Sequence, residues 1–317
     1  MLTCYQRFKE AATCQHATVD FLLWSVVISM ATLVPQPAHA VQTLKPSYAE
    51  LVKTSAPGDW RPIDNDNTIY MELASGRVVF ELAPQFAPLH AANIKALVRE
   101  GFFDGTTIMR VQENYVVQFG EEDSKKPIKT AQHKVAPEFT VPMQRNMPFT
   151  RLPDVDGYAK QVGFANGFHV GRDPKTKQTW LTHCTSTLGV GRDNEADSGN
   201  GTELYVVTGH APRQLDRNIA LVGRVVQGMS LLTVLPRGTM EMGFYEKREQ
   251  HVPIKSLRMA ADVPPAERSN LEIIRTESPR FKAMVEALRN RGGDWYKVPA
   301  GHISLCNVPI AVREKAQ

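Results

Sequence analysis

The stretch from Gly101 to Glu121 reads GFFDGTTIMRVQENYVVQFGE and is the most informative part of the chain. Two short runs within it are rich in β-branched and aromatic residues, which is typical of β-strands. Arg110, Tyr115 and Gln118 lie on these runs. A second stretch, 201–229, reads GTELYVVTGHAPRQLDRNIALVGRVVQGM and has the matching form of a hairpin that ends in a Gly-Arg-Val-Val strand. Both stretches therefore indicate a fold built from short strands.

The rest of the chain supports this interpretation. Residues 68–73 (TIYMEL) and 77–82 (RVVFEL) alternate apolar and polar side chains around Ala-Ser-Gly, which predicts a hairpin. A helix is expected to begin at Pro88 and to end near Gly101. Many short strands with one or two helices favour a mainly β barrel over an α/β parallel sheet. Further strands are predicted over 115–119, 203–208, 220–227 and 252–259.

In this order, the two quoted stretches resemble the catalytic face of the cyclophilins, the β-barrel peptidyl-prolyl cis-trans isomerases. The resemblance runs from about Ile69 to Met259 and is interrupted by an insertion. It implies a closed eight-stranded antiparallel β-barrel capped by two helices. One of these helices is expected over 88–100 and the other around 229–235. The resemblance also implies an isomerase, or rotamase, that assists protein folding.

Four regions follow from this comparison: 1–40, a polar lead-in over 41–66, a cyclophilin-like domain over 67–260, and a C-terminal extension over 261–317. The segment from about 121 to 187 is rich in Pro, Gly, Lys and Asp and is expected to be an inserted loop region. In the extension, Ser278 and Pro279 predict the start of a helix with one apolar stripe. Such a helix packs on the barrel or meets a partner, and packing is favoured because a short isolated helix is marginal.

The chemistry of prolyl isomerisation fits an arginine in an apolar pocket. Amide resonance sets a barrier of about 18–20 kcal/mol to rotation, and a twisted prolyl nitrogen regains a lone pair that accepts a hydrogen bond. An arginine donates that bond without losing its proton. The reaction needs no nucleophile, metal or cofactor, and the sequence contains neither a G-x-S-x-G nor an H-E-x-x-H motif.

By resemblance, Arg110 takes this catalytic role, and Gln118 hydrogen-bonds the substrate backbone. Tyr115 and Tyr205 stand where the family holds the proline ring with phenylalanines, and an apolar wall completes the pocket. An ordinary cross-strand pair is the alternative explanation for Arg110. The wall is assigned to Leu204 and Leu215.

The chain departs from the family at several positions of this site. Glu203 replaces a glutamine and places a carboxylate close to Arg110, while Met109 replaces a histidine. Gln214 and Ile219 stand at the pocket rim, where an aromatic residue and a histidine are usual. These differences leave a second hypothesis open, in which the groove belongs to a non-catalytic proline-peptide-binding chaperone or to an envelope assembly factor.

The N-terminus predicts export. Phe21–Val34 (FLLWSVVISMATLV) is uncharged and apolar, and Ala38-His39-Ala40 follows as a cleavage site, so the mature chain is expected to begin at Val41. The run of about 14 residues is shorter than the roughly 20 that a transmembrane helix needs. Residues 1–40 are therefore predicted to be a signal peptide and the protein to be periplasmic. An uncleaved membrane anchor is the alternative, because acidic residues offset the basic ones before this run.

Charge and cysteines bear on the partners and the compartment. The net charge of +4 on 317 residues is spread along the chain, so no nucleic acid partner is expected. The expected partners are proline-containing peptides and unfolded exported proteins. Removal of residues 1–40 leaves Cys184 and Cys306. These two form a disulfide or are two buried thiols, and an exported setting favours the disulfide.

Overall fold

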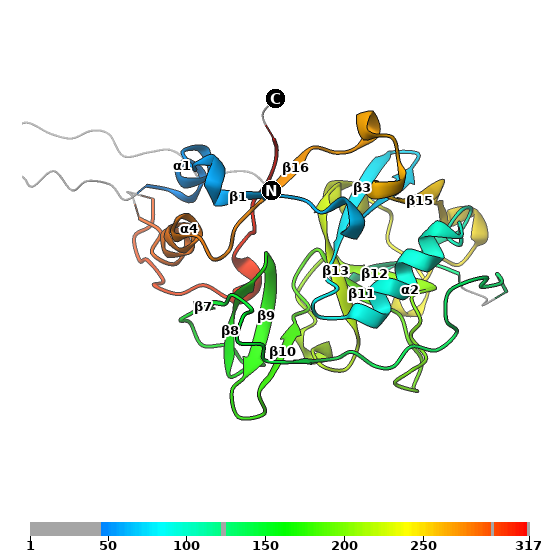
Figure 1. Cartoon of the computed structure of the whole chain (residues 1–317), viewed down its shortest axis with the longest axis horizontal. Coiled ribbons are helices and arrows are strands. Elements are labelled where there is room, and N and C mark those ends of the chain that lie inside the picture. The colour runs from blue at the N-terminus through cyan, green and yellow to red at the C-terminus, as the bar shows by residue number, and fades with distance from the viewer. Residues whose placement is uncertain (1–45, 122–124, 293–294, 316–317) are drawn as a thin grey trace, which may run out of the picture. The chain divides into compact units, whose positions relative to one another are not determined.

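A curled antiparallel sheet forms the centre of the fold (Figure 1). The computed structural model describes residues 46–121, 125–292 and 295–315. Within these residues the central sheet has nine strands, in the order β14-β4-β5-β12-β11-β13-β3-β2-β15. Their bounds are β2 Thr68–Leu73, β3 Gly76–Leu82, β4 Thr107–Val111, β5 Val116–Gly120, β11 Thr187–Val190, β12 Glu203–Val207, β13 Leu221–Gln227, β14 Val252–Pro253 and β15 Ser256–Met259.

This sheet corrects one detail of the expected barrel. The mainly β fold is confirmed, but the strands pair in an open order of nine rather than in a closed ring of eight. The predicted strand over 252–259 is divided, because Ile254 and Lys255 separate β14 from β15. These two short strands pair with β4 and β2 at opposite ends of the sheet. The segment 252–259 therefore supplies both edge strands of the sheet.

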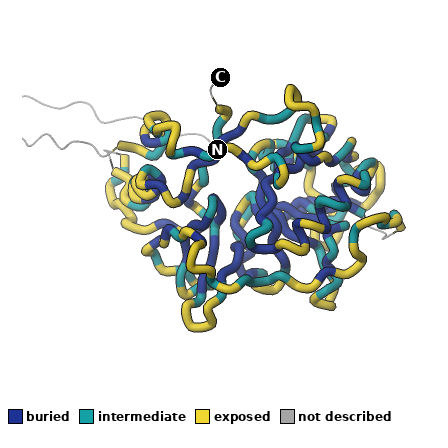
Figure 2. The backbone as a smooth tube through the Cα atoms, viewed as in Figure 1, coloured by how far each residue is buried: buried dark blue, intermediate teal, exposed yellow. Residues whose placement is uncertain are grey.

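Two helices accompany the central sheet, as predicted. Helix α2 covers Pro88–Arg99, and its buried Ile94, Leu97 and Val98 pack into the core of the sheet. Helix α3 covers Met229–Thr233 and buries Leu232 in the same core. Figure 2 shows the buried backbone concentrated in the strands, with exposed backbone at the connecting loops. The described part of the chain has no helix that is long and apolar enough to cross a membrane.

The inserted segment corrects a second expectation, because it folds into strands instead of a loop region. The described residues between 125 and 187 contain an antiparallel sheet of five strands in the order β6-β10-β9-β8-β7. It packs on the outer face of the central sheet through a shared apolar cluster that includes Phe168, Val170 and Leu181 from the insertion. Its strands are β6 Val141–Pro142, β7 Thr150–Leu152, β8 Gln161–Ala165, β9 Phe168–Asp173 and β10 Gln178–Leu181.

The lead-in and the C-terminal extension fold together. Helix α1 (Tyr48–Lys53) contacts helix α4 (Pro279–Arg289), and a sheet in the described residues has the order β1-β16-β17. The predicted cap of α4 is confirmed, since Ser278 Oγ accepts the N–H of Phe281 at 3.0 Å. Helix α4 buries Phe281 against Phe164 of the insertion. The strands of this sheet are β1 Trp60–Pro62, β16 Leu271–Ile274 and β17 Val312–Glu314.

A disulfide joins Cys184 to Cys306 and resolves the alternative left open by the sequence. It connects the segment before β11 to the extension, inside the apolar cluster that also contains Trp60 and Phe281. The described residues belong to one unit that begins at Leu44. The predicted signal peptide over 1–40 and the first residues of the lead-in lie outside the described residues.

Candidate active site

A row of paired residues runs across four neighbouring strands and positions the site. Arg110 on β4 pairs with Gln118 on β5, and Gln118 pairs with Tyr205 on β12. Tyr205 in turn pairs with Gly189 on β11. Residues paired in register across neighbouring strands project from the same face of the sheet. The sheet therefore places a guanidinium, an amide and a phenol ring side by side.

Hydrogen bonds hold the Arg110 side chain in this row. Its Nε donates to the carbonyl oxygen of Met242 at 2.7 Å, and its Nη1 donates to Gln118 Oε1 at 3.0 Å. Its Nη2 donates to Gln112 Oε1. Arg110 is only 8% exposed, and burial lowers its pKa from the ordinary value. The guanidinium stays charged, because its ordinary pKa lies far above neutral pH.

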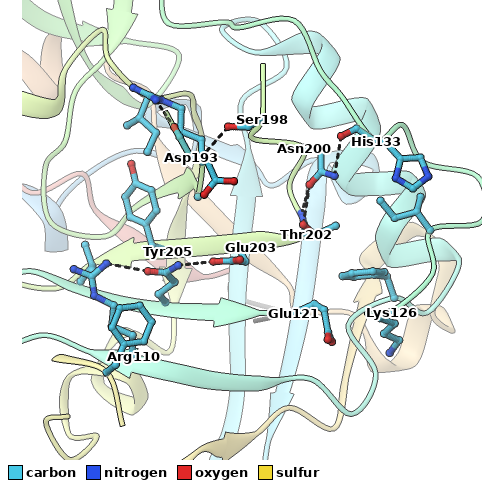
Figure 3. Close-up of a pocket in the computed structure, with 18 of the residues that line it drawn as sticks. Arg110, Glu121, Lys126, His133, Asp193, Ser198, Asn200, Thr202, Glu203 and Tyr205 are labelled. Atoms are coloured by element: carbon cyan, nitrogen blue, oxygen red, sulfur yellow. Dashed lines mark hydrogen bonds between the residues drawn. The ribbon is translucent and has the colours of Figure 1, made fainter. Parts of the chain in front are cut away.

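Gln118 connects Arg110 to Glu203. While its Oε1 accepts from Arg110, its Nε2 donates to Glu203 Oε2 at 2.6 Å (Figure 3). The acceptor and donor ends of the Gln118 amide are thus fixed by their two partners. The carboxylate predicted near Arg110 is present, and it acts on the guanidinium through this amide.

A groove of about 840 Å³ lies over the row. It brings together seven of the eight predicted site residues: Arg110, Tyr115, Gln118, Glu203, Tyr205, Leu215 and Ile219. Leu215 belongs to the 3-10 helix Arg213–Leu215, and Ile219 follows it before β13. At this end the lining is mainly apolar and includes Val116, which the sequence analysis did not single out. The apolar character of this end suits a proline ring.

Leu204 is the exception and corrects a prediction. It lies on β12 between Glu203 and Tyr205, and side chains alternate between the two faces of a strand. Because its neighbours face the groove, Leu204 faces the opposite side, where it is 1% exposed within the apolar core under α2. It therefore forms no part of the pocket wall.

Two further segments line the groove that the sequence analysis missed. Met242 and Phe244 lie above Arg110, with the Phe244 ring 5.3 Å from the guanidinium carbon. At the other end lie residues 125–128, among them Lys126 (Figure 3). Lys126 Nζ donates to the carbonyl oxygen of Asp104 at 2.6 Å. Neither segment carries a recognisable motif. The available signal was the aromatic pair Phe244-Tyr245, which precedes a polar stretch.

The groove and its buried arginine have the features expected of a prolyl isomerase. Comparison with known proteins identifies the family. Residues 68–259 match the family described as cyclophilin type peptidyl-prolyl cis-trans isomerase/CLD. The match covers more than half of the chain. The protein therefore belongs to the cyclophilin-type peptidyl-prolyl cis-trans isomerases, and the isomerase activity predicted from the sequence agrees with this family.

Individual relatives support the assignment. A probable peptidyl-prolyl cis-trans isomerase of Brucella suis biovar 1 (strain 1330) is 25% identical over 183 residues, which are 56% of this chain and 74% of the relative. The peptidyl-prolyl cis-trans isomerase-like 1 of Homo sapiens is 24% identical over 212 residues, which are 66% of this chain and 96% of that protein.

A solved structure extends the likeness beyond the family domain. The crystal structure of the cyclophilin AquaCyp293 from Hirschia baltica is 25% identical, with a TM-score of 0.65. It covers 82% of this chain and 96% of its own. That share is larger than residues 68–259 provide, so part of the lead-in or the extension is also similar.

The described residues contain no group of three or more His, Cys, Asp or Glu side chains placed to hold a metal ion. The residues that line the groove include two arginines, two lysines, a histidine, hydroxyl groups, amides, carboxylates and apolar or aromatic side chains. This set can bind an extended peptide and place a hydrogen-bond donor beside a prolyl bond.

Proposed function

We propose that Arg110 catalyses prolyl isomerisation by donating a hydrogen bond to the prolyl nitrogen of a bound polypeptide. As the bond twists, the amide loses its resonance and the nitrogen regains a basic lone pair. A bond that forms only in this twisted state stabilises the transition state more than the bound substrate. In a site with little water, the charge of Arg110 acts more strongly than it does in bulk solvent.

The observation that carries this proposal is the row of Arg110, Gln118 and Tyr205 on three adjacent strands. Tyr115, Tyr205 and Leu215 would hold the proline ring at the apolar end of the groove. Gln118 would bind the backbone beside it. Among the described residues, acceptors occupy three of the five N–H groups of Arg110, which leaves two for the substrate.

A proline-peptide binder without catalytic turnover is the second candidate. It is favoured by the same three hydrogen bonds, because they tie Arg110 to Met242, Gln112 and Gln118. It is also favoured by Glu203, whose negative charge is coupled to the guanidinium through Gln118. In such a protein the groove would hold a client segment and release it unchanged.

Exchange NMR on a short Ala-Pro peptide, which needs no protease, distinguishes the two candidates. The wild type is expected to accelerate cis-trans exchange, and Arg110→Ala is expected to lose at least a hundredfold of this rate while still binding the peptide. Arg99→Ala is the matched control, because Arg99 makes an exposed ion pair with Asp262 away from the groove. It should exchange the peptide at the wild-type rate.

The outcomes have separate meanings. A wild type that binds the peptide without accelerating exchange supports the binding module. Acceleration that survives in Arg110→Ala contradicts the role of Arg110 and leaves the groove as the site.

We further propose that the protein acts on unfolded exported polypeptides in the periplasm. The disulfide between Cys184 and Cys306 supports an oxidising compartment, where such bonds persist. The intact mass of the protein isolated from its own cells tests this proposal. A mass that corresponds to a chain starting at Val41 is expected, and one that includes residues 1–40 would indicate an anchored or cytoplasmic protein instead.

A further inference from the structure

A buried hydrogen-bond network lies behind the apolar end of the groove. The Tyr205 hydroxyl is 2.9 Å from His183 Nε2, and His183 Nδ1 is 2.9 Å from Asp216 Oδ1. None of these three residues is more than 6% exposed, and His183 is fully buried. Tyr205 lines the groove, and its hydroxyl is bonded to a network that is buried behind it.

The partners fix the direction of each hydrogen bond. Asp216 also accepts the Nε–H of Arg213 at 2.7 Å and the backbone N–H of His183 at 2.9 Å. Burial alone would raise the pKa of Asp216, but the bonds from His183 and Arg213 outweigh it and lower the pKa. An ionised carboxylate can only accept, so His183 Nδ1 carries a proton, and Nε2 accepts from the Tyr205 hydroxyl when this is the only proton on the ring.

The order hydroxyl, imidazole, carboxylate is also that of nucleophilic triads, but the chemistry here differs. Burial raises the pKa of Tyr205 well above its ordinary value, so the phenol keeps its proton. Its hydrogen bond goes to His183, which has no exposed surface. The network therefore fixes the position of the ring and does not activate the hydroxyl.

The backbone leaves room for this ring at Gly189. A Cβ atom at that position would overlap Cζ and Oη of Tyr205, so the ring occupies the space that another side chain would fill. The ring lies across the neighbouring strand and reaches His183 beyond it. His183 therefore holds the Tyr205 ring by a hydrogen bond to its hydroxyl group.

The same carboxylate also anchors the pocket wall. Asp216 directly follows Leu215 and comes shortly before Ile219, both of which line the groove. Arg213 extends the network to Asp156 of the insertion through two bonds of 2.8 and 3.0 Å. The network thus fixes Tyr205, which forms the floor of the pocket. It also fixes the wall formed by Leu215 and Ile219.

We propose that His183 is a positioning residue that holds Tyr205 and the loop of Asp216 in register with Arg110. This inference rests on the proposed proline-binding function of the groove. A pocket holds the proline ring in the cis, trans and twisted states alike. Loss of its floor should therefore weaken binding of all three states, which changes substrate affinity and leaves the maximal rate nearly unchanged.

Three variants test the proposal by NMR titration and exchange on the Ala-Pro peptide. His183→Leu removes both hydrogen bonds and is expected to raise the Kd about tenfold, with the exchange rate at saturation within about twofold of wild type. Tyr205→Phe should have a similar effect. His183→Gln can accept from Tyr205 and donate to Asp216, so it should restore the Kd to within about threefold of wild type.

The double variant His183→Leu/Tyr205→Phe should be no worse than the worse single variant, because both changes break the same bond between Tyr205 and His183. A folded His183→Leu protein with wild-type Kd overturns the proposal, as does an unchanged Kd in Tyr205→Phe if His183→Leu does not fold. A loss of maximal rate at constant Kd also overturns it. Because the Kd is measured independently of turnover, the result stands whether or not Arg110 proves catalytic.

Discussion

At the scale of single residues, the side chain of Arg110 is already hydrogen-bonded within the protein, without a bound substrate. Three of its five N–H groups already have acceptors, and Gln118, one of these acceptors, also bonds to Glu203. A substrate must compete with these bonds or use the two remaining N–H groups. The carboxylate also reduces the positive field that the twisted prolyl nitrogen would experience.

Glu203→Gln should therefore increase the rate of isomerisation. The amide oxygen of glutamine can still accept from Gln118, while the negative charge near Arg110 disappears. We expect kcat/KM to rise about three- to tenfold, corresponding to roughly 1 kcal/mol of transition-state stabilisation. Exchange NMR at several peptide concentrations gives this value. A decrease below wild type would show that the carboxylate serves chiefly to hold Gln118 in place.

Gly189 lies on β11, next to Tyr205 on β12. Gly189→Ala should therefore disturb the pocket through the Tyr205 ring. The new methyl group would overlap the Tyr205 ring, which must then leave its place above β11. We expect the free energy of unfolding to fall by about 1–3 kcal/mol and peptide affinity to weaken.

Urea unfolding and NMR titration measure the two effects of Gly189→Ala. Gly58→Ala is the matched control, because no atom lies within 4 Å of its added Cβ. Equal stability and affinity in the two variants would contradict the close packing of Tyr205 on β11.

At the scale of elements, the insertion contains strands although its overall composition predicted a loop. Its proline, glycine and lysine content indicated a loop, yet Asn166 and Gly167 connect β8 and β9 as a tight turn with φ of 50° and 84°. An Asn-Gly pair between alternating apolar residues is a strong hairpin signal, since this turn needs two positive φ angles. The hairpin could thus have been predicted from FANGFHV, and the loop prediction gave too much weight to overall composition.

Strand β9 also carries His169, which makes stability depend on pH. Burial lowers its pKa to about 4, although the bond of its Nε2 to the carbonyl oxygen of Val308 opposes the shift. Between pH 6.5 and 4 the unfolded chain takes up a proton that the folded protein does not. Stability should therefore be complete above pH 6.5 and fall by up to about 3 kcal/mol as the pH drops to 4.

The contribution of His169 appears as a difference between variants. His169→Gln can still donate to Val308 but does not titrate, so its free energy of unfolding should decline less steeply from pH 6.5 to 4 than that of the wild type. His302→Gln, at an exposed position, is the control and should follow the wild-type curve. Parallel curves for wild type and His169→Gln would contradict a depressed pKa at His169.

At the scale of the whole molecule, the two ends of the described chain are built into the fold. Strand β1 of the lead-in pairs with β16 of the extension, and helix α1 contacts α4. Trp60 lies in the same apolar cluster as the disulfide and Phe281. The lead-in and the extension therefore stabilise each other.

The disulfide should contribute strongly to this part of the molecule. It joins cysteines separated by 122 positions, and a crosslink across a long loop restricts the unfolded chain. We expect Cys184→Ser/Cys306→Ser to lower the free energy of unfolding by about 2–5 kcal/mol in guanidinium titrations. Reductant should lower the stability of the wild type and leave the double variant unchanged. Equal midpoints for oxidised and reduced wild type would contradict the prediction.

The sequence was most informative where local patterns decide the structure. The 68–82 hairpin and the cap at Ser278 depend on neighbouring residues, while the place of Arg110, Tyr115 and Gln118 in the groove was predicted from the family resemblance. The parts it did not reveal depend on contacts between distant segments. His183 reaches Tyr205 only through the pairing of β11 with β12, and Phe244 reaches Arg110 from a loop that no motif marks. The alternation of side chains along β12 would have placed Leu204 in the core. The prediction that Leu204 lines the pocket followed the resemblance alone.

The division of 252–259 into β14 and β15 has a consequence for aggregation. An exposed edge of a sheet offers unpaired N–H and C=O groups to which another chain can add as a strand. The proposed substrates are unfolded polypeptides, which carry such unpaired backbone. Here one edge strand has two residues, one of them Pro253, which lacks an N–H, and the other has four. The central sheet therefore offers little edge for strand addition, which would keep the unfolded polypeptides that we propose as substrates from assembling on it.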